Sequence, residues 1–186
     1  MSIGASRQRS GLYHLIPWHE MRRTPGVIFD CLKLAEVGEV AAFDRVLHAR
    51  GAVSPGPVGY VPRPWYMHTH QIDNLIVFHG TRYVELYSPE HGSMEHFTVK
   101  PNLVLHGSQV LAEGGAILGW PVGVFHRITS CDKEGSASLN LAIHKPGFDL
   151  RTNFNIYDLD VASGQFRVVR AGHLDQPGRG GSEGVP

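Results

Sequence analysis

Hydrophobic and polar residues alternate in short runs along much of the chain, and turn-forming residues separate these runs. Residues 81–90 (TRYVELYSPE) and 94–102 (MEHFTVKPN) flank the loop His-Gly-Ser, and residues 153–161 (NFNIYDLDV) and 165–172 (QFRVVRAG) flank Ala-Ser-Gly. Alternation with a period of two is typical of half-buried strands, and a short polar loop joins two such strands into a hairpin. The pattern therefore predicts two antiparallel hairpins.

Other runs predict further strands. Residues 73–80 (DNLIVFHG) are apolar on both faces, as in a strand inside a sandwich, and residues 41–53 fit a strand or a helix, of which we favour the strand. Residues 116–130 and 138–147 flank the turn-like segment 131–137, and residues 17–21 (PWHEM) indicate one short helix. Many short strands separated by turns predict an all-β jelly-roll or barrel with little helix.

Composition agrees with this fold and narrows the partners. The 22 glycines and 12 prolines favour short elements joined by turns. The 17 basic residues balance the 17 acidic residues, which gives no electrostatic case for nucleic acid or an anionic membrane surface. The chain lacks an apolar run of membrane-spanning length or a recognisable secretory signal, so we expect a cytoplasmic protein. Cys31 and Cys131 predict no disulfide framework.

The length of 186 residues suits one domain. The polar, glycine-containing ends predict disordered tails at residues 1–11 and 175–186. One domain is then expected over residues 12–174.

The histidines His68 and His70 form the first candidate site. On a strand, residues two apart share a face, so the two imidazoles would be either a pair of metal ligands or neighbours without a metal. In residues 115–126 (GAILGWPVGVFH), Pro121 and Gly123 predict a tight turn that aims His126. A second strand thus offers a third imidazole.

These two segments resemble the two motifs of the cupin superfamily. Gly115, Pro121, Gly123 and His126 match the second motif, in which Ser130 replaces the closing asparagine. The first motif matches at His68, His70, the carboxylate Asp73 and Gly80, with Pro62 in place of its leading glycine. Asp73 follows His70 after two residues, and Asn74 stands at the family's shorter spacing. The resemblance spans roughly residues 41–145 and implies a double-stranded β-helix, or jelly-roll barrel.

The resemblance also implies a metal centre. Its ligands would be three imidazoles and a carboxylate, from His68, His70, Asp73 and His126, although Asp73 could instead hold a water or a histidine N–H outside the metal's ligand shell. Such donors suit one divalent transition metal ion, for which we favour Fe(II) or Mn(II) over Zn(II) or Ni(II). Open positions on the ion would bind water, dioxygen or substrate.

The expected function is that of a metal-dependent cupin enzyme acting on a small organic molecule. Oxygen-dependent, dioxygenase-type chemistry is the preferred reaction. A metal-assisted isomerase or lyase, or a non-catalytic module that binds a metal or small ligand, is the alternative. Because cupins are commonly dimeric, we expect a homodimer. The catalytic residues themselves stay unassigned.

Three residues are candidates for substrate contact. Tyr66 shares strand parity with His68, while Asn140 and His144 share one face of residues 138–144. Each could equally be a packing or exposed residue. No nucleophile elbow, dinucleotide-binding glycine motif or phosphate-binding loop is present in the sequence, so nucleotide-cofactor and serine-hydrolase chemistry are not indicated.

Overall fold

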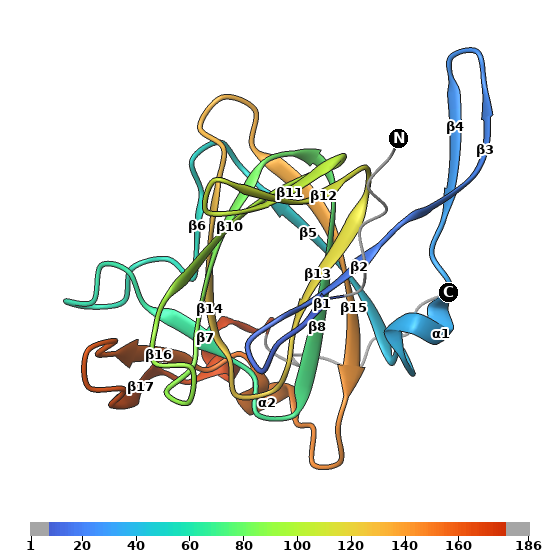
Figure 1. The fold of residues 1–186 in the computed structure, drawn as a ribbon. Helices are drawn as coiled ribbons and strands as arrows, with labels where there is room; N and C mark the ends of the chain where they lie inside the picture. The colour runs from blue at the N-terminus through green and yellow to red at the C-terminus, as the bar shows by residue number, and fades with distance from the viewer. Residues whose placement is uncertain (1–7, 178–186) are drawn as a thin grey trace, which may run out of the picture.

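Two antiparallel sheets face each other and enclose the interior of the protein (Figure 1). A computed structural model describes residues 8–177 of the chain. The first sheet has six strands in the order β1 (Gln8–Arg9), β2 (His14–Pro17), β13 (Ala116–Trp120), β8 (Gln71–Gly80), β15 (Ser136–His144) and β5 (Ala42–His48).

The second sheet has nine strands. Its order is β12 (Gln109–Glu113), β11 (Leu103–His106), β10 (Glu95–Lys100), β9 (Arg82–Tyr87), β14 (Phe125–Ser130), β7 (Trp65–Met67), β16 (Ile156–Leu159) and β17 (Phe166–Arg170), with β6 (Val53–Ser54) also paired to β14. In Figure 1, β10 and β14 stand on one side of the interior and β8 and β15 stand on the other. This arrangement is an all-β jelly roll, and the predicted fold class is confirmed.

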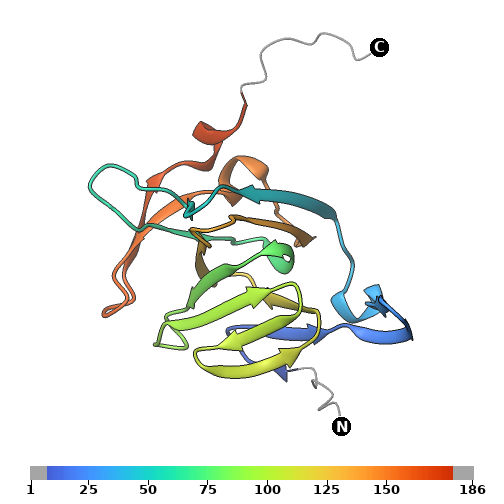
Figure 2. The ribbon, with the colours of Figure 1, turned by 90° about the horizontal axis from the view of Figure 1, so that it is seen from above.

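Two hairpins extend from opposite sides of the barrel. The hairpin of β3 (His19–Thr24) and β4 (Val27–Cys31) is a separate two-stranded sheet, whereas β16 and β17 continue the nine-stranded sheet. Figures 1 and 2 show these hairpins projecting in opposite directions. The only helices in residues 8–177 are short: α1 (Leu34–Val37), α2 (Leu150–Asn153) and the 3₁₀ helix η1 (Gly172–Asp175).

The main core fills one part of the barrel. It consists of inward-facing apolar residues from both sheets, among them Leu75, Leu86, Phe97 and Leu118, each at most 3% exposed. Packing of this kind is favourable because it removes large apolar areas from water. A smaller cluster around Ile76, on the opposite face of β8, contacts partly buried residues of the segment that contains α1. Both faces of β8 are therefore largely buried, as its apolar sequence indicates.

Most of the predicted strands are confirmed. The pairs β9–β10 and β16–β17 are the two hairpins read from the alternation, and residues 42–48 of the ambiguous segment form β5. The predicted helix at residues 17–21 is wrong, because that stretch lies at the end of β2 and in β3. There, β2 pairs with β13 and buries Leu15 and Ile16 completely, so tertiary packing decides the local structure.

The predicted tails lie mainly outside the described residues, namely at residues 1–7 and 178–186. Gln8 and Arg9, inside the segment assigned to the N-terminal tail, already pair with β2, and Asp175 closes η1. Across residues 8–177, no helix has both the length and the apolar character needed to cross a membrane.

Candidate metal centre and its cavity

His68 and His70 do not share a face, because they do not lie on a strand. β7 ends at Met67 and β8 begins at Gln71, so both histidines occupy the connection between the strands. His68 is 4% exposed and points into the barrel. His70 is half-buried; its Nδ1 lies 2.9 Å from the Thr69 hydroxyl and its ring lies beside Gly147. The parity prediction is wrong, and the structure leaves His70 apart from the cluster described next.

His68, Asp73 and His126 converge on one point inside the barrel. The Nε2 atoms of His68 and His126 lie 3.2 Å and 3.7 Å from the same carboxylate oxygen, Oδ2 of Asp73. The three ligand atoms all lie within 4.8 Å of one another, and each residue is at most 5% exposed. Asp73 comes from β8 and His126 from β14, so facing sheets supply the cluster.

The far nitrogens of both histidines face backbone carbonyls. His68 Nδ1 lies 2.6 Å from the carbonyl oxygen of Asn153, and His126 Nδ1 lies 3.3 Å from that of Val124. A proton on Nδ1 is then held by the carbonyl, which leaves the Nε2 lone pair directed at the cluster. Histidines that bind metals usually have this tautomer and this kind of outer hydrogen bond. Two imidazoles and one carboxylate thus fit a divalent transition metal ion.

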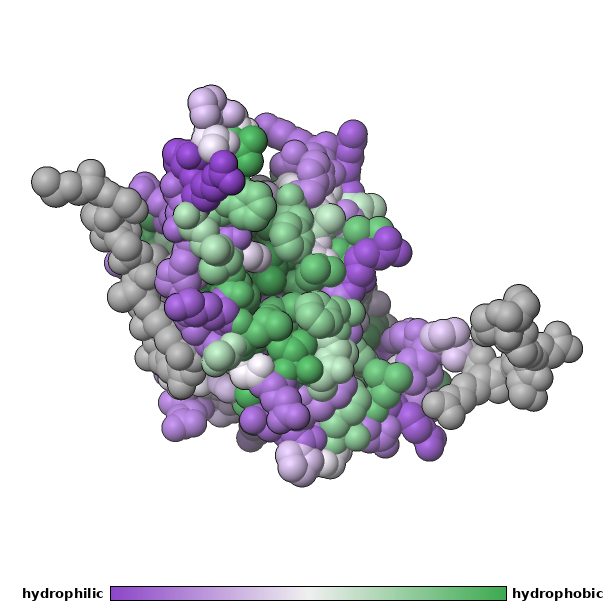
Figure 3. Space-filling view, turned by 90° about the vertical axis from the view of Figure 1, so that its right-hand side faces the viewer, coloured by the Kyte–Doolittle hydropathy of each residue, from purple (hydrophilic) through white to green (hydrophobic). Residues whose placement is uncertain are grey.

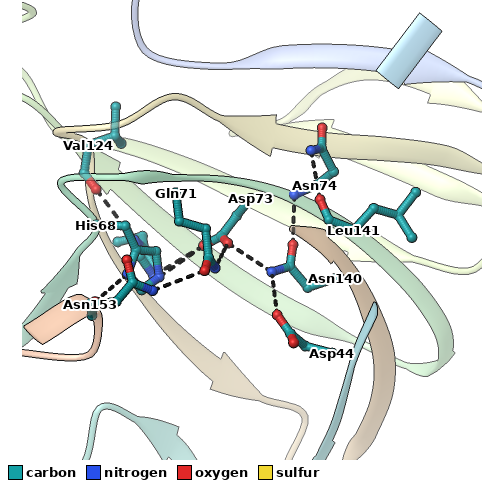
Figure 4. Close-up of polar contacts among 10 residues, drawn as sticks. Asp44, His68, Gln71, Asp73, Asn74, Val124, Asn140, Leu141 and Asn153 are labelled. Carbon is teal, nitrogen blue, oxygen red and sulfur yellow. Dashed lines mark hydrogen bonds and ion pairs between the residues drawn. The ribbon is translucent and has the colours of Figure 1, made fainter. Parts of the chain in front are cut away.

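Amide side chains hold the Asp73 carboxylate in place (Figure 4). Its Oδ1 accepts hydrogen bonds from Gln71 Nε2 at 2.6 Å and from Asn140 Nδ2 at 2.8 Å. Gln71 in turn accepts a hydrogen bond from Asn153 Nδ2 at 3.0 Å. These bonds use one carboxylate oxygen and leave Oδ2 facing the histidines.

Asn74 faces the other way and takes no part in the cluster. Its Nδ2 donates to the Leu141 carbonyl at 2.9 Å, and its Oδ1 lies 2.7 Å from His14 Nε2. Adjacent residues on a strand point to opposite faces, which is why Asp73 and Asn74 diverge. Of these two residues, only Asp73 lies among the converging side chains.

The charges of the cluster are interdependent. Burial lowers the pKa of His126 to about 4, and the neighbouring His68 adds to this effect. Burial also opposes charge on His68, but the Asp73 carboxylate outweighs it and raises the pKa of this imidazole. The two histidines conversely hold the pKa of Asp73 well below its usual range, against the effect of burial. The cluster therefore favours one protonated histidine beside an ionised carboxylate. A bound cation would supply the same positive charge.

The cluster forms part of the wall of a cavity of about 310 Å³. Tyr66 and Asn140, two of the predicted substrate contacts, also line this cavity. His144 lies outside it and stacks on Phe148, with ring centroids 3.6 Å apart. Asn140 and His144 do leave β15 on one face, but four residues along the strand carry His144 past the cavity.

The rest of the wall is largely apolar, with several buried polar atoms. Trp120 packs its ring 5.0 Å from that of His126, and Phe154 packs against His68 at 5.4 Å. Within the described residues, the Trp120 indole nitrogen, His48 Nδ1, Ser138 Oγ and Asn153 Oδ1 are buried without a hydrogen-bond partner. A mostly apolar pocket with a few unpaired polar groups is typical of a small-molecule site.

Comparison with known proteins supports the fold. No protein-family model matches the chain, and no curated protein matches its sequence. The solved structures that resemble it include the sugar 3,4-ketoisomerase QdtA from Thermoanaerobacterium thermosaccharolyticum in complex with TDP. That structure aligns over 74% of this chain and 82% of its own, with a TM-score of 0.50 and 13% identity. A variant of the same enzyme, in complex with TDP-4-keto-6-deoxyglucose, aligns equally well, with a TM-score of 0.50 and 13% identity. At this identity the likeness concerns the cupin-like fold.

Sequence reasoning did not single out several residues of this site. Gln71 and Asn153 hold the cluster, and Arg82 and His48 line the cavity. Gln71 and Arg82 could have been noticed, because each is a long polar residue at an end of an apolar strand. Asn153 carries no such signal, since 82 residues separate it from Gln71, its partner.

Proposed function

We propose that this chain is a metal-dependent isomerase that moves a proton on a small carbonyl compound bound in the barrel cavity. The observation that carries the proposal is the convergence of His68 Nε2, Asp73 Oδ2 and His126 Nε2 at the cavity wall, with both Nδ1 atoms facing backbone carbonyls. A divalent ion held there would act as a Lewis acid on a substrate oxygen.

A histidine base without a metal fits this geometry less well. A general base needs one nitrogen free to reach the substrate. In His68, Nδ1 faces the Asn153 carbonyl and Nε2 faces Asp73, so neither nitrogen is free. This argument applies to His68, whereas His126 Nε2 lies 3.7 Å from Asp73 Oδ2, beyond hydrogen-bond distance, and in our proposal serves as a metal ligand.

Tyr66 and Asp44 are the residues that would transfer protons to and from the substrate. They line the cavity from opposite sheets, Tyr66 on β7 and Asp44 on β5. Burial raises the pKa of Tyr66, although a hydrogen bond with Ser54 partly opposes this, and the phenol therefore stays protonated as a donor. The Asp44 carboxylate, which accepts from Asn140 Nδ2 at 3.2 Å, can take a proton from the substrate. A substrate carbon between these residues could lose and regain a proton.

The reaction class also has support from the fold comparison, since the enzyme of similar fold is a 3,4-ketoisomerase. Proton transfer beside a carbonyl exchanges the substrate's C–H with solvent. The test is therefore to incubate metal-loaded protein in D₂O with a panel of hydroxyketones, keto acids and TDP-4-keto-6-deoxyglucose. Proton NMR should show loss of a C–H signal with wild-type protein, and a large loss of rate in Tyr66→Phe at unchanged metal content. Exchange that continues at the full rate in His126→Ala would contradict the proposal.

Oxygen-dependent chemistry is the second candidate, with which the donor set is also compatible. Two histidines and one carboxylate are also the ligands of non-haem iron oxygenases. The same panel should therefore be examined with an oxygen electrode after loading with Fe(II). Substrate-dependent oxygen uptake without C–H exchange would favour this candidate over the isomerase.

We also propose that two copies of the chain pair through the outer face of the six-stranded sheet. Figure 3 shows hydrophobic side chains gathered on this side of the molecule. On the outer face of β5, Phe43 and Leu47 are each 64% exposed, and Phe78 of β8 is 55% exposed. Exposed apolar groups of this kind are typical of interfaces.

A further inference from the structure

Arg82 is a buried charge without a carboxylate partner. It begins β9, is 1% exposed and lines the cavity. Its Nε donates to Ser136 Oγ at 3.0 Å and its Nη2 donates to the Val46 carbonyl at 3.0 Å. No carboxylate among residues 8–177 forms an ion pair with it. Buried charges are normally paired with an opposite charge, and this guanidinium lacks such a counter-ion.

Two more polar groups at the same end of the cavity lack partners. His48 Nδ1 and Ser138 Oγ are both buried without a hydrogen bond, and both residues line the cavity. His48 lies two residues from Val46 on β5, and Ser138 pairs with Val46 across the sheet. Since Arg82 also bonds to Val46, the three polar groups surround one place in the wall. Unsatisfied buried groups cost free energy unless a ligand or water pairs with them.

The polar groups lie at some distance from the metal centre. Ser138 and Asn140 are two residues apart on β15, about 7 Å at a strand's rise, and Asn140 contacts Asp73. On β14, Ser130 pairs with Arg82 and lies four residues beyond His126, about 13 Å. One small molecule can therefore contact both ends, and about 310 Å³ sets the size of that molecule.

The charge at this end suits a monoanion. Burial, together with the Arg82 charge, lowers the pKa of His48 to about 4, so this imidazole is neutral near pH 7. Arg82 then supplies one positive charge, while Asp44 and Asp73 bring carboxylates to the same cavity. A phosphate monoester, with about two negative charges, would be poorly neutralised. A carboxylate matches both the charge and the planar guanidinium.

We propose that Arg82, Ser138 and His48 form an anion subsite, and that the substrate is a small carboxylic acid whose carboxylate binds there. The reacting end of the same molecule faces His68, Asp73 and His126. This inference rests on the proposed function in one respect: it takes the cavity to be the substrate site. It narrows the carbonyl compound to one that carries a carboxylate, such as a keto acid.

The test is a binding measurement that needs no turnover. Benzoate, its neutral isostere benzamide and inorganic phosphate are titrated into metal-free protein by calorimetry. Benzoate should bind, and benzamide and phosphate should bind at least tenfold more weakly. Equal binding of benzoate and benzamide would overturn the anion subsite, and preferential binding of phosphate would overturn the assignment to carboxylates.

Variants locate the binding. Arg82→Gln should weaken benzoate binding about 10- to 100-fold, the usual effect of losing a hydrogen bond to a charged group. The matched control is Arg45→Gln, on the exposed outer face of β5, which should bind benzoate like the wild type. If Arg82→Gln does not fold, Arg82→Lys and Ser138→Ala replace it, and both should weaken binding. Wild-type affinity in these cavity variants would overturn the proposal.

Metal content is measured on separate, metal-loaded portions of the same variants, which separates the two proposals. Arg82→Gln and Ser138→Ala should keep the metal, because neither residue touches His68, Asp73 or His126 in the described contacts. If the protein binds metal but benzoate affinity does not depend on Arg82, the subsite is refuted and the metal-centre proposal stands. Absence of metal together with Arg82-dependent benzoate binding would do the reverse.

Discussion

At the scale of single residues, the different positions of His68, inside the cluster, and His70, outside it, lead to a prediction about metal content. His126→Ala and Asp73→Asn should each lose most of the bound metal, because each removes one of three converging ligand atoms. His70→Ala is the matched control and should retain it, since this ring lies beside Thr69 and Gly147. Elemental analysis of protein purified without chelator or affinity nickel measures all three. Loss of metal in His70→Ala would restore the four-ligand set of the sequence hypothesis.

His48 makes a second prediction, about pH and stability. Its folded pKa of about 4 lies below its ordinary value of 6.5, so the unfolded state binds a proton more readily. The contribution of neutral His48 to stability is therefore complete above pH 6.5 and declines as the pH falls towards 4. Urea unfolding should show a steeper loss over this range in wild-type protein than in His48→Gln. The difference should stay below ~1.4 kcal/mol per pH unit, because His48 is only half-buried.

The control for this experiment is His79→Gln, at an exposed position near the end of β8. Its pH dependence should match that of the wild type. Equal slopes for wild-type protein and His48→Gln would show that His48 is not held neutral by its surroundings.

These residues also show what the sequence could and could not predict of the site. Asp73 and His126 were recognisable because each lies in a strand or follows a turn within a spaced motif. His70 belongs to the same motif, but the strand is interrupted at residues 68–70, and His70 therefore lies outside the cluster. Ser138 and His48 were not recognisable, nor was their proximity to Arg82, because only the pairing of β5 with β15 and the position of β9 in the facing sheet bring the three residues to one cavity.

At the scale of elements, Gly80 shows how a strand end depends on a close approach. It ends β8 with a φ of +69°, and a Cβ added there would lie 2.0 Å from the Gly135 carbonyl oxygen. Gly92, in the β9–β10 loop, has a similar φ of +76° with no atom within 4 Å of such a Cβ. Gly92→Ala should therefore cost about 1–2 kcal/mol, the penalty of a left-handed conformation. Gly80→Ala should cost about 1–3 kcal/mol more, because the backbone must also move.

Urea unfolding of both variants measures this difference directly. Similar costs at Gly80 and Gly92 would mean that the turn before residue 82 adjusts easily, and that the approach of β8 to Gly135 does not fix the strand end.

The strand predictions, like this turn, depend on contacts between neighbouring segments of the chain. Alternation and polar loops specify local pairing, which is why β9–β10 and β16–β17 could be read directly. Residues 17–21 carry local signals for a helix start, yet β2 gains more by burying Leu15 and Ile16 against β13. Which strands become neighbours in each sheet depends on such distant contacts.

At the scale of the whole molecule, the exposed apolar face at β5 predicts a two-fold dimer. β5 is the last strand of its sheet, and Phe43 and Leu47 extend from its outer face into solvent. An exposed apolar face of this kind is typical of an interface, and pairing with a second copy buries the same residues on both partners. Phe43→Glu should disrupt such a dimer by placing two carboxylates in the interface. Sedimentation velocity should give a dimer for the wild type and for Val110→Glu, a control at an exposed position of β12 in the other sheet, and a monomer for Phe43→Glu. A monomeric wild type at micromolar concentration would refute the dimer.

Because the cavity wall is complete within one chain, the metal content of a monomeric Phe43→Glu should equal that of the wild type. Loss of metal on dissociation would instead mean that pairing at β5 also positions Asp44 and the adjoining wall.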